Sequence, residues 1–253
     1  MNKLKRLGEI LYAMDTYDVF EFYKLTGASA LQFLIFDIGF ITEDLNFDLD
    51  TNLDVSKVNE IRNLVNQVLP QLLQKKNFTI DVKLTKLTGK LDTYVIKDNL
   101  SSEIFKLNFN YLNRVHVLNP EYFARKDSHF EDLHIYALSN LENYARYIVE
   151  FLEGKYGDKI LNDLITNKKV LPQQYPFLRK IIAFYMSISD SYKEINLNQV
   201  DKRLHDLLAF NDKELKYLKD SQNGIFDLSL ILPPTMSNKL QNHPSVKMLR
   251  VVS

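Results

Sequence analysis

Residues 42–50 read Thr-Glu-Asp-Leu-Asn-Phe-Asp-Leu-Asp. Hydrophobic and polar residues alternate strictly here, which is the pattern of a β-strand with one buried and one polar face. Earlier in the chain, Gly27 closes a short segment and is followed by residues 28–36, an apolar stretch with helical spacing. The order of segment, tight turn, helix and strand predicts a domain that mixes helices with a sheet.

Hydrophobic periodicity predicts further elements on both sides of this strand. Residues 4–14 and 55–76 have helical spacing, and Asp54 or Ser56 is suited to cap the second helix. Alternating hydrophobic residues separated by turn residues predict an antiparallel meander and one later strand. These strands are residues 78–84, 91–96, 103–112 and 133–138. The first part of the chain is therefore expected to be an α+β domain with a mixed sheet and covering helices.

The pattern becomes helical after Ser139, where Ser139 and Glu142 have the spacing of a capping box. The expected helices are residues 141–153, 158–165, 177–187, 200–210 and 212–219. We therefore predict two domains, residues 1–138 and residues 139–253, the second an all-α helical bundle.

Composition excludes several classes of protein. The chain has 253 residues, with 45% hydrophobic and 25% charged residues, which is typical of a soluble globular protein. The absence of cysteine excludes disulfides, thiolate metal sites and cysteine nucleophiles. Its 32 basic residues balance its 32 acidic residues, so no global field attracts nucleic acid or an anionic membrane. With neither a signal peptide nor a long apolar run, we expect a cytoplasmic protein without membrane contact.

Two features of the first domain point to phosphate chemistry. Residues two apart on a strand project from the same face at about 6.6 Å, so Asp44 and position 46 are spaced to hold two divalent cations. Gly27, Ala28 and Ser29 come where a helix begins, a position that presents backbone amides and a hydroxyl to a phosphate. Without this turn, the polar side of residues 44–50 is more typical of the solvated face of a half-buried strand.

The joint motif resembles the AbiEii/AbiGii toxin-type nucleotidyltransferases of the polymerase-β-like superfamily. Residues 24–31, Lys-Leu-Thr-Gly-Ala-Ser-Ala-Leu, resemble the Leu-Thr-Gly-Gly-Thr-Ala-Leu of that family, and residues 42–47 resemble its Thr-x-Asp-Leu-Asp-Phe. Residues 105–111, followed by Arg114, are similar to the strand that carries the family's third carboxylate. The resemblance covers roughly residues 1–140 and implies a nucleotidyltransferase-like fold.

The resemblance also implies roles for individual residues. The catalytic positions are Asp44, Asn46 and Asn108, and the nucleotide-binding residues are Lys24, Gly27, Ala28 and Ser29. Apart from the resemblance, Asp48 shares the polar face of the strand, so Asp44 and Asp48 are the candidate ligands for Mg²⁺, although about 13 Å would separate them on a regular strand. A bulge that shortens the strand would instead allow a site at Asn46 and Asp48. The implied substrate is a nucleoside triphosphate, the implied acceptor is an RNA or a protein, and the implied setting is a toxin–antitoxin system.

Three residues depart from the family pattern. Asn46 and Asn108 stand at two of the three acidic positions, and Ala28 replaces the second glycine of the turn. Only Asp44 keeps its charge, so two divalent cations would be poorly neutralised. These departures leave two hypotheses for the first domain. It is either an active nucleotidyltransferase, or a catalytically weak or inactive relative that binds a nucleotide or a protein partner. A third makes the helical domain an interaction module that forms a homodimer or binds an antitoxin.

Overall fold

The computed structural model describes residues 3–34, 42–51, 53–111, 116–126, 130, 132–152, 170 and 172–188. The chain divides into two compact units, residues 1–139 and residues 140–253. This division lies one residue after the boundary expected from the sequence.

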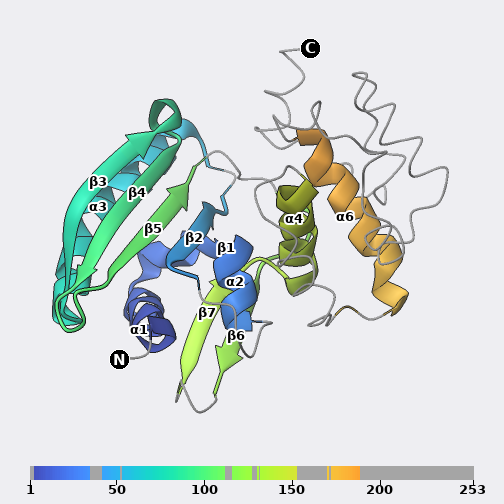
Figure 1. Cartoon of the computed structure of the whole chain (residues 1–253). Coiled ribbons are helices and arrows are strands. Elements are labelled where there is room, and N and C mark those ends of the chain that lie inside the picture. Colours follow the sequence, from blue (N-terminus) through green and yellow to red (C-terminus); the bar gives the residue numbers. More distant parts are fainter. Residues whose placement is uncertain are drawn as a thin grey trace. The chain divides into compact units, whose positions relative to one another are not determined.

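The first unit is an α+β domain in which helices cover a seven-strand mixed sheet (Figure 1). Its helices are α1 (Lys3–Asp15), α2 (Gly27–Leu34) and α3 (Val55–Lys75), with short 3-10 helices at Asp18–Phe22 and Leu87–Gly89. Its strands are β1 (Tyr23–Thr26), β2 (Asp44–Leu49), β3 (Phe78–Lys86), β4 (Leu91–Asp98), β5 (Ile104–Asn110), β6 (Glu121–Arg125) and β7 (Leu133–Ala137). Every strand predicted from alternation is confirmed, whereas β1 and β6 were not predicted.

The strand order is β3-β4-β5-β2-β1-β7-β6. Strands β3, β4 and β5 form the predicted antiparallel meander. Strand β2 lies at the centre, antiparallel to β1 and parallel to β5, and β1 is parallel to β7. The central position of β2 brings residues from distant parts of the sequence onto one face of the sheet.

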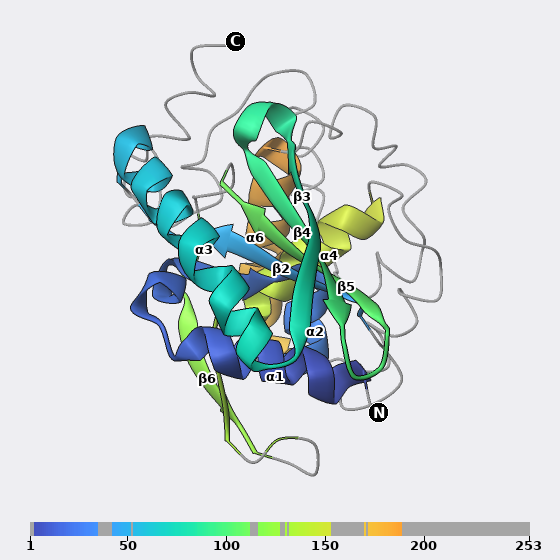
Figure 2. The ribbon, with the colours of Figure 1, turned by 90° about the vertical axis from the view of Figure 1, so that its left-hand side faces the viewer.

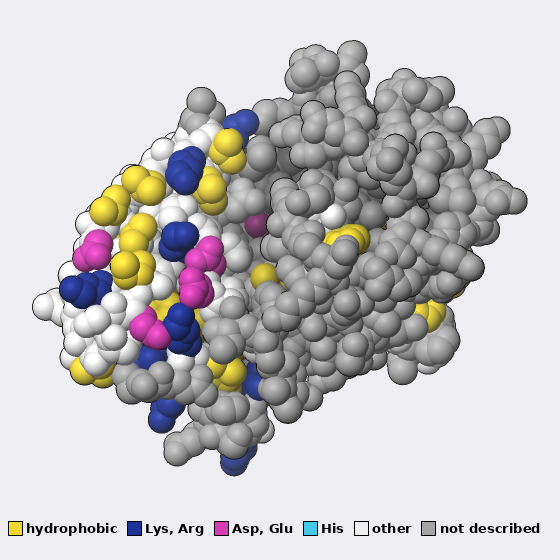
Figure 3. All heavy atoms as spheres, viewed as in Figure 1, with side chains coloured by type: hydrophobic (Ala, Val, Ile, Leu, Met, Phe, Trp, Pro, Cys, Tyr) yellow, Lys and Arg dark blue, Asp and Glu magenta, His cyan; other side chains and the backbone are white. Residues whose placement is uncertain are grey.

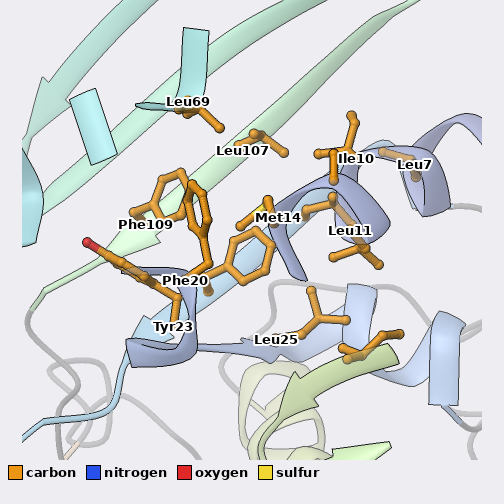
Figure 4. Close-up of a cluster of buried hydrophobic side chains, with 14 of the residues drawn as sticks. Leu7, Ile10, Leu11, Met14, Phe20, Tyr23, Leu25, Leu69, Leu107 and Phe109 are labelled. Atoms are coloured by element: carbon orange, nitrogen blue, oxygen red, sulfur yellow. The ribbon is translucent and has the colours of Figure 1, made fainter. Parts of the chain in front are cut away.

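The hydrophobic core lies on the sheet face to which Leu45, Phe47 and Leu49 contribute from β2. Helices α1 and α3 cover this face, and Figure 4 shows hydrophobic side chains of α1 gathered with Leu107 and Leu25 of the sheet. Burying a side chain of this size contributes about 1.5–3 kcal/mol relative to leaving it in water. Alternation therefore directs the even-numbered residues of β2 to the opposite face, where the candidate site lies.

A β-bulge in β3 changes which of its side chains reach the core. The register with β4 shifts between Ile80 and Val82, so Val82 and Leu84 face away from α3 and are exposed. Figures 1 and 2 show α3 running along the other face of β3 and β4, and Figure 3 shows hydrophobic and charged side chains interspersed on the uncovered face. The sequence predicted one regular strand here, because Phe78, Ile80, Val82 and Leu84 keep a period of two.

The second unit is described over two helices, α4 (Asn140–Leu152) and α6 (Tyr175–Ile188), with a 3-10 helix at Pro172–Gln174. The two helices pack together, and the Tyr185 hydroxyl donates a hydrogen bond to the Glu142 carboxylate. The expected helices at residues 158–165, 200–210 and 212–219 lie outside the described residues, so the bundle stays a prediction. None of the helices in the described ranges is long and apolar enough to cross a membrane.

Candidate functional site

The candidate site lies on the sheet face opposite the core, where four polar side chains form a continuous row. In the strand register Thr26 lies opposite Asn46, Asn46 opposite Asn108, and Asn108 opposite Thr93. Residues directly opposite each other on neighbouring strands share a face and lie within side-chain contact. Thr26, Asn46, Asn108 and Thr93 are called the amide row below. The two asparagines that the sequence singled out are thus neighbours at its centre.

Hydrogen bonds fix the orientation of both asparagine side chains. The Thr93 hydroxyl donates to Asn108 Oδ1 at 2.8 Å, and Asn108 Nδ2 donates to Asn46 Oδ1 at 2.9 Å. Asn108 also acts on the Asp44 carboxyl group, whose pKa it lowers against the larger effect of burial. Asn108 therefore directs its NH₂ group toward the Asn46 side chain of β2.

Asp44 begins β2 and is half-buried beside the amide row. Burial raises the pKa of the Asp44 carboxyl group above its usual value, although the charge of Lys106 and the hydrogen bond from Asn108 act in the opposite direction. Its backbone is held by Thr42, whose hydroxyl donates to Asp44 O at 2.8 Å and accepts from Asp44 N at 3.2 Å. Burial thus makes the carboxylate costly to ionise, and Lys106 and Asn108 reduce this cost only in part.

The turn at Gly27 lies directly beside β2. Gly27 has a φ of +64°, the left-handed region that glycine adopts without strain, and a Cβ there would meet no atom within 4 Å. The Ser29 hydroxyl donates to Thr26 O at 2.9 Å and accepts from Asn46 N at 3.0 Å. This pair of hydrogen bonds joins the start of α2 to the centre of the amide row.

The same contacts change the role expected for Ser29. Its side chain is fully buried, and the single hydroxyl hydrogen is directed to Thr26 O. The donors that α2 offers to an anion are therefore the backbone N–H groups of its first turn, which have no acceptor inside the helix. Ala28 is half-buried in this turn and adds no charge.

The structure does not bring Lys24 to the turn. Its side chain is buried, with the ammonium group donating to Glu21 O and lying 4.8 Å from the centroid of the Tyr136 ring. Burial lowers the pKa of Lys24, and the charges of Asp50 and Glu21 act against this shift. The ammonium group is thus engaged near the start of β1, whereas Gly27 follows the end of that strand.

Asp44 and Asp48 are not brought together either. The register between β2 and β5 runs without a bulge from Asp44 to Asp48, so a regular strand separates them by about 13 Å. Asp48 is 1% exposed and accepts a hydrogen bond from Asn110 Nδ2 at 3.0 Å. The polar side of β2 is therefore not simply a solvated face.

The side chains of the amide row do not fit a pair of Mg²⁺ ions. Hard divalent cations require several oxygen ligands, preferably carboxylates, whereas Asn108 presents an N–H group to Asn46. Over the residues that the structure describes, no group of three or more His, Cys, Asp or Glu side chains is placed to hold a metal ion. The arrangement suits direct hydrogen bonding to an anion better than binding of two cations.

Thr93 was not identified as part of this site from the sequence. Its position in the predicted strand at residues 91–96 places it on the same face as Leu91 and Val95, but the strand pairing that puts it opposite Asn108 is a tertiary property.

Comparison of the chain with models of known protein families finds no match, and a search of curated proteins finds none either. The functional assignment therefore depends on the geometry of the amide row and the adjoining turn.

Proposed function

We propose that the first domain is nucleotidyltransferase-like and binds a nucleoside triphosphate at the turn formed by Gly27, Ala28 and Ser29, without two-metal nucleotidyl transfer. The observation that carries this proposal is the Ser29 hydroxyl, which links the start of α2 to Asn46 at the centre of the amide row. A phosphate at the first turn of α2 would thus lie beside the row. The resemblance of residues 24–31 and 42–47 to nucleotidyltransferase motifs supports the same ligand.

Electrostatics favour binding over catalysis at this site. Carboxylates at positions 46 and 108 would repel the phosphates unless divalent cations neutralised them. Asparagine keeps nearly the same shape at both positions without that repulsion. The N–H groups of α2 and the positive end of its dipole attract phosphate oxygens directly. The amide row is therefore compatible with a triphosphate bound in the absence of paired cations.

Substitution of Ala28 tests this proposal. Ala28→Glu introduces a carboxylate at the first turn of α2, where an acidic side chain favours the helix but repels a phosphate. Ala28→Gln has the same length without the charge and serves as the matched control. Calorimetric titration with each of the four triphosphates is expected to show binding to wild type and to Ala28→Gln. Binding to Ala28→Glu is expected to be weakened about tenfold or more.

Two results would count against nucleotide binding at this turn. The first is wild-type protein that takes up none of the four triphosphates at millimolar concentration. The second is equal affinity in Ala28→Glu and Ala28→Gln, which would place the triphosphate elsewhere on the molecule.

A second candidate function is transfer of a nucleotide to an RNA or protein acceptor, and the half-buried carboxylate of Asp44, two residues before Asn46 on β2, favours it. Incubation with each labelled triphosphate, Mg²⁺ or Mn²⁺, and bulk RNA or protein would then label an acceptor. Asp44→Ala would abolish the labelling. Absence of labelled product under every combination would exclude this activity for the acceptors tested.

A further inference from the structure

A cavity of about 30 Å³ opens where strands β1 and β7 separate. The two strands are parallel, and their register is the single pair of Leu25 and Ala137. Two residues earlier on each strand, Tyr23 and Ile135 line the cavity instead of pairing with each other. The end of α1 and the 3-10 helix at residues 18–22 complete the walls. The cavity therefore lies within the first unit and shares no residue with the amide row.

The floor of the cavity is apolar. It is formed by the buried side chains of Leu11, Met14, Phe20, Tyr23, Phe47 and Ile135. Figure 4 shows four of them, Leu11, Met14, Phe20 and Tyr23, gathered on the core side of the sheet. The Tyr23 hydroxyl is engaged with the Tyr111 hydroxyl at 3.5 Å. A water molecule on this floor would lack the two to four polar partners that it needs, so the floor suits the end of a hydrocarbon chain.

The rim of the same cavity is acidic. Asp15 and Glu21 line it from the end of α1 and from the 3-10 helix, and both are exposed. The Asp15 carboxylate accepts a hydrogen bond from the Tyr122 hydroxyl at 3.4 Å and lies 3.9 Å from His134 Nδ1. Within the described part of the chain, the Glu21 carboxylate forms no hydrogen bond or ion pair. One carboxylate is thus held in place and the other is available to a ligand.

Neighbouring lysines reduce this charge without cancelling it. Lys24 Nζ lies 4.8 Å from the centroid of the Tyr136 ring, and Lys75 Nζ lies 3.5 Å from the Tyr17 hydroxyl. Asp132 adds a third carboxylate, 3.0 Å from the imidazole group at the rim. Three carboxylates and two ammonium groups leave the rim with one negative charge in excess. The rings of Tyr17 and Tyr136, which also line the cavity, add a further attraction for cations.

We propose that this cavity binds a small alkylammonium ion, with its hydrocarbon end on the apolar floor and its ammonium group at the carboxylates of Asp15 and Glu21. The order of the two chemistries selects the ligand. An alcohol of the same length lacks the charge, and a carboxylate is repelled by the rim. A lysine side chain carries its ammonium group at the free end, which would have to leave water for the apolar floor.

Nuclear magnetic resonance of the full chain, with labelled methyl groups of Met14 and Ile135, tests this proposal at pH 7. Titration with n-butylammonium is expected to shift both signals and to saturate in the millimolar range. Binding of n-butanol is expected to be about tenfold weaker, because it gains neither the ion pairs nor the cation–π contact. Butyrate and N-acetyl-lysine methylamide are expected to leave both signals in place. Absence of any shift with n-butylammonium, equal affinity for n-butanol, or tighter binding of the lysine amide would overturn the proposal.

Two isosteric variants test the role of the rim. Asp15→Asn and Glu21→Gln are each expected to weaken n-butylammonium binding about threefold and to leave n-butanol binding unchanged. Glu60→Gln removes an exposed carboxylate of α3 that does not line the cavity and serves as the matched control. Unchanged n-butylammonium affinity in both rim variants, or an equal loss in Glu60→Gln, would contradict recognition of the ammonium group by these carboxylates.

Discussion

The ion pair between Arg6 and Asp98 offers a quantitative test of how the first unit is held together. Arg6 lies on α1 and Asp98 ends β4, and the two side chains are 2% and 0% exposed. Arg6 Nε and Nη2 donate to the two carboxylate oxygens at 2.9 and 2.7 Å, and Nη2 also donates to Lys76 O at 2.8 Å. The guanidinium group additionally lies 4.0 Å from the centroid of the Phe78 ring.

Arg6→Met is expected to lower the free energy of unfolding by about 3–5 kcal/mol at pH 7, because it leaves a buried carboxylate without its cation. The Ser101 hydroxyl and the Leu100 N–H still donate to Asp98, which places the cost within this range rather than above it. Urea denaturation followed by circular dichroism measures the change.

The pH dependence of this loss has a defined sign. Burial opposes ionisation of Asp98, but hydrogen bonds from Arg6 and Ser101 outweigh it and hold the pKa of Asp98 below its usual value. A lowered pKa contributes stability above the unfolded-state pKa, which is lost as the pH falls through the folded-state pKa. The difference between wild type and Arg6→Met is therefore expected to be largest near neutral pH and to shrink below about pH 4.

Lys57→Met provides the matched control, because Lys57 forms an exposed ion pair with Glu60 on α3. Exposed ion pairs contribute little, so this variant is expected to remain close to wild type. An Arg6→Met variant no less stable than Lys57→Met would contradict the assignment of the Arg6–Asp98 pair as a principal link between α1 and the sheet.

Three smaller predictions concern single positions in the first unit. Gly8→Ala is expected to lower the free energy of unfolding by about 1–3 kcal/mol despite the higher helix propensity of alanine, because the added Cβ would lie 2.1 Å from Phe130 Cε1. A higher urea midpoint for Gly8→Ala than for wild type would contradict this. Gly27→Ala is expected to cost about 1–2 kcal/mol through its positive φ alone, since no atom lies near the added Cβ, and the same titration measures it. Burial raises the pKa of Asp44, so its charged form destabilises the folded state above the unfolded-state pKa. Asp44→Asn is therefore expected to have a higher melting temperature than wild type at pH 7, and the difference is expected to vanish below about pH 4. A lower melting temperature of Asp44→Asn at pH 7 would contradict this sign.

Local pattern was sufficient to predict the elements that carry the candidate site. Strict alternation predicted β2, and Gly27 followed by helical spacing predicted the start of α2. Asp54 caps α3 as expected, since its side chain accepts from Lys57 N. These features depend on neighbouring residues, which is why they are legible in the sequence.

Features that depend on strand pairing were not predictable in this way. Strand β1 is buried at all four positions and therefore lacks the alternation that identifies β2. The bulge after Ile80 leaves the period-two pattern of β3 intact in the sequence while reversing which side chains face α3. The same shift brings Lys83 and Thr85 to the buried carboxylate of Asp92.

The candidate site shows the same division between local and tertiary information. The residues of the turn and of β2 were identified from the sequence, but the roles of Lys24 and Ser29 depend on partners that only the fold supplies. The inclusion of Thr93 and the direction of the Asn108 amide also follow from the pairing of β4, β5 and β2.

The most direct test of triphosphate binding beside the amide row is hydrogen–deuterium exchange of the full chain with and without a saturating triphosphate in EDTA. Slower exchange is expected in peptides that cover the start of α2 and strand β2, and Ala28→Glu is expected to abolish the effect while Ala28→Gln retains it. Unchanged exchange in these peptides, or protection confined to another part of the chain, would contradict the assignment of this turn as the phosphate site.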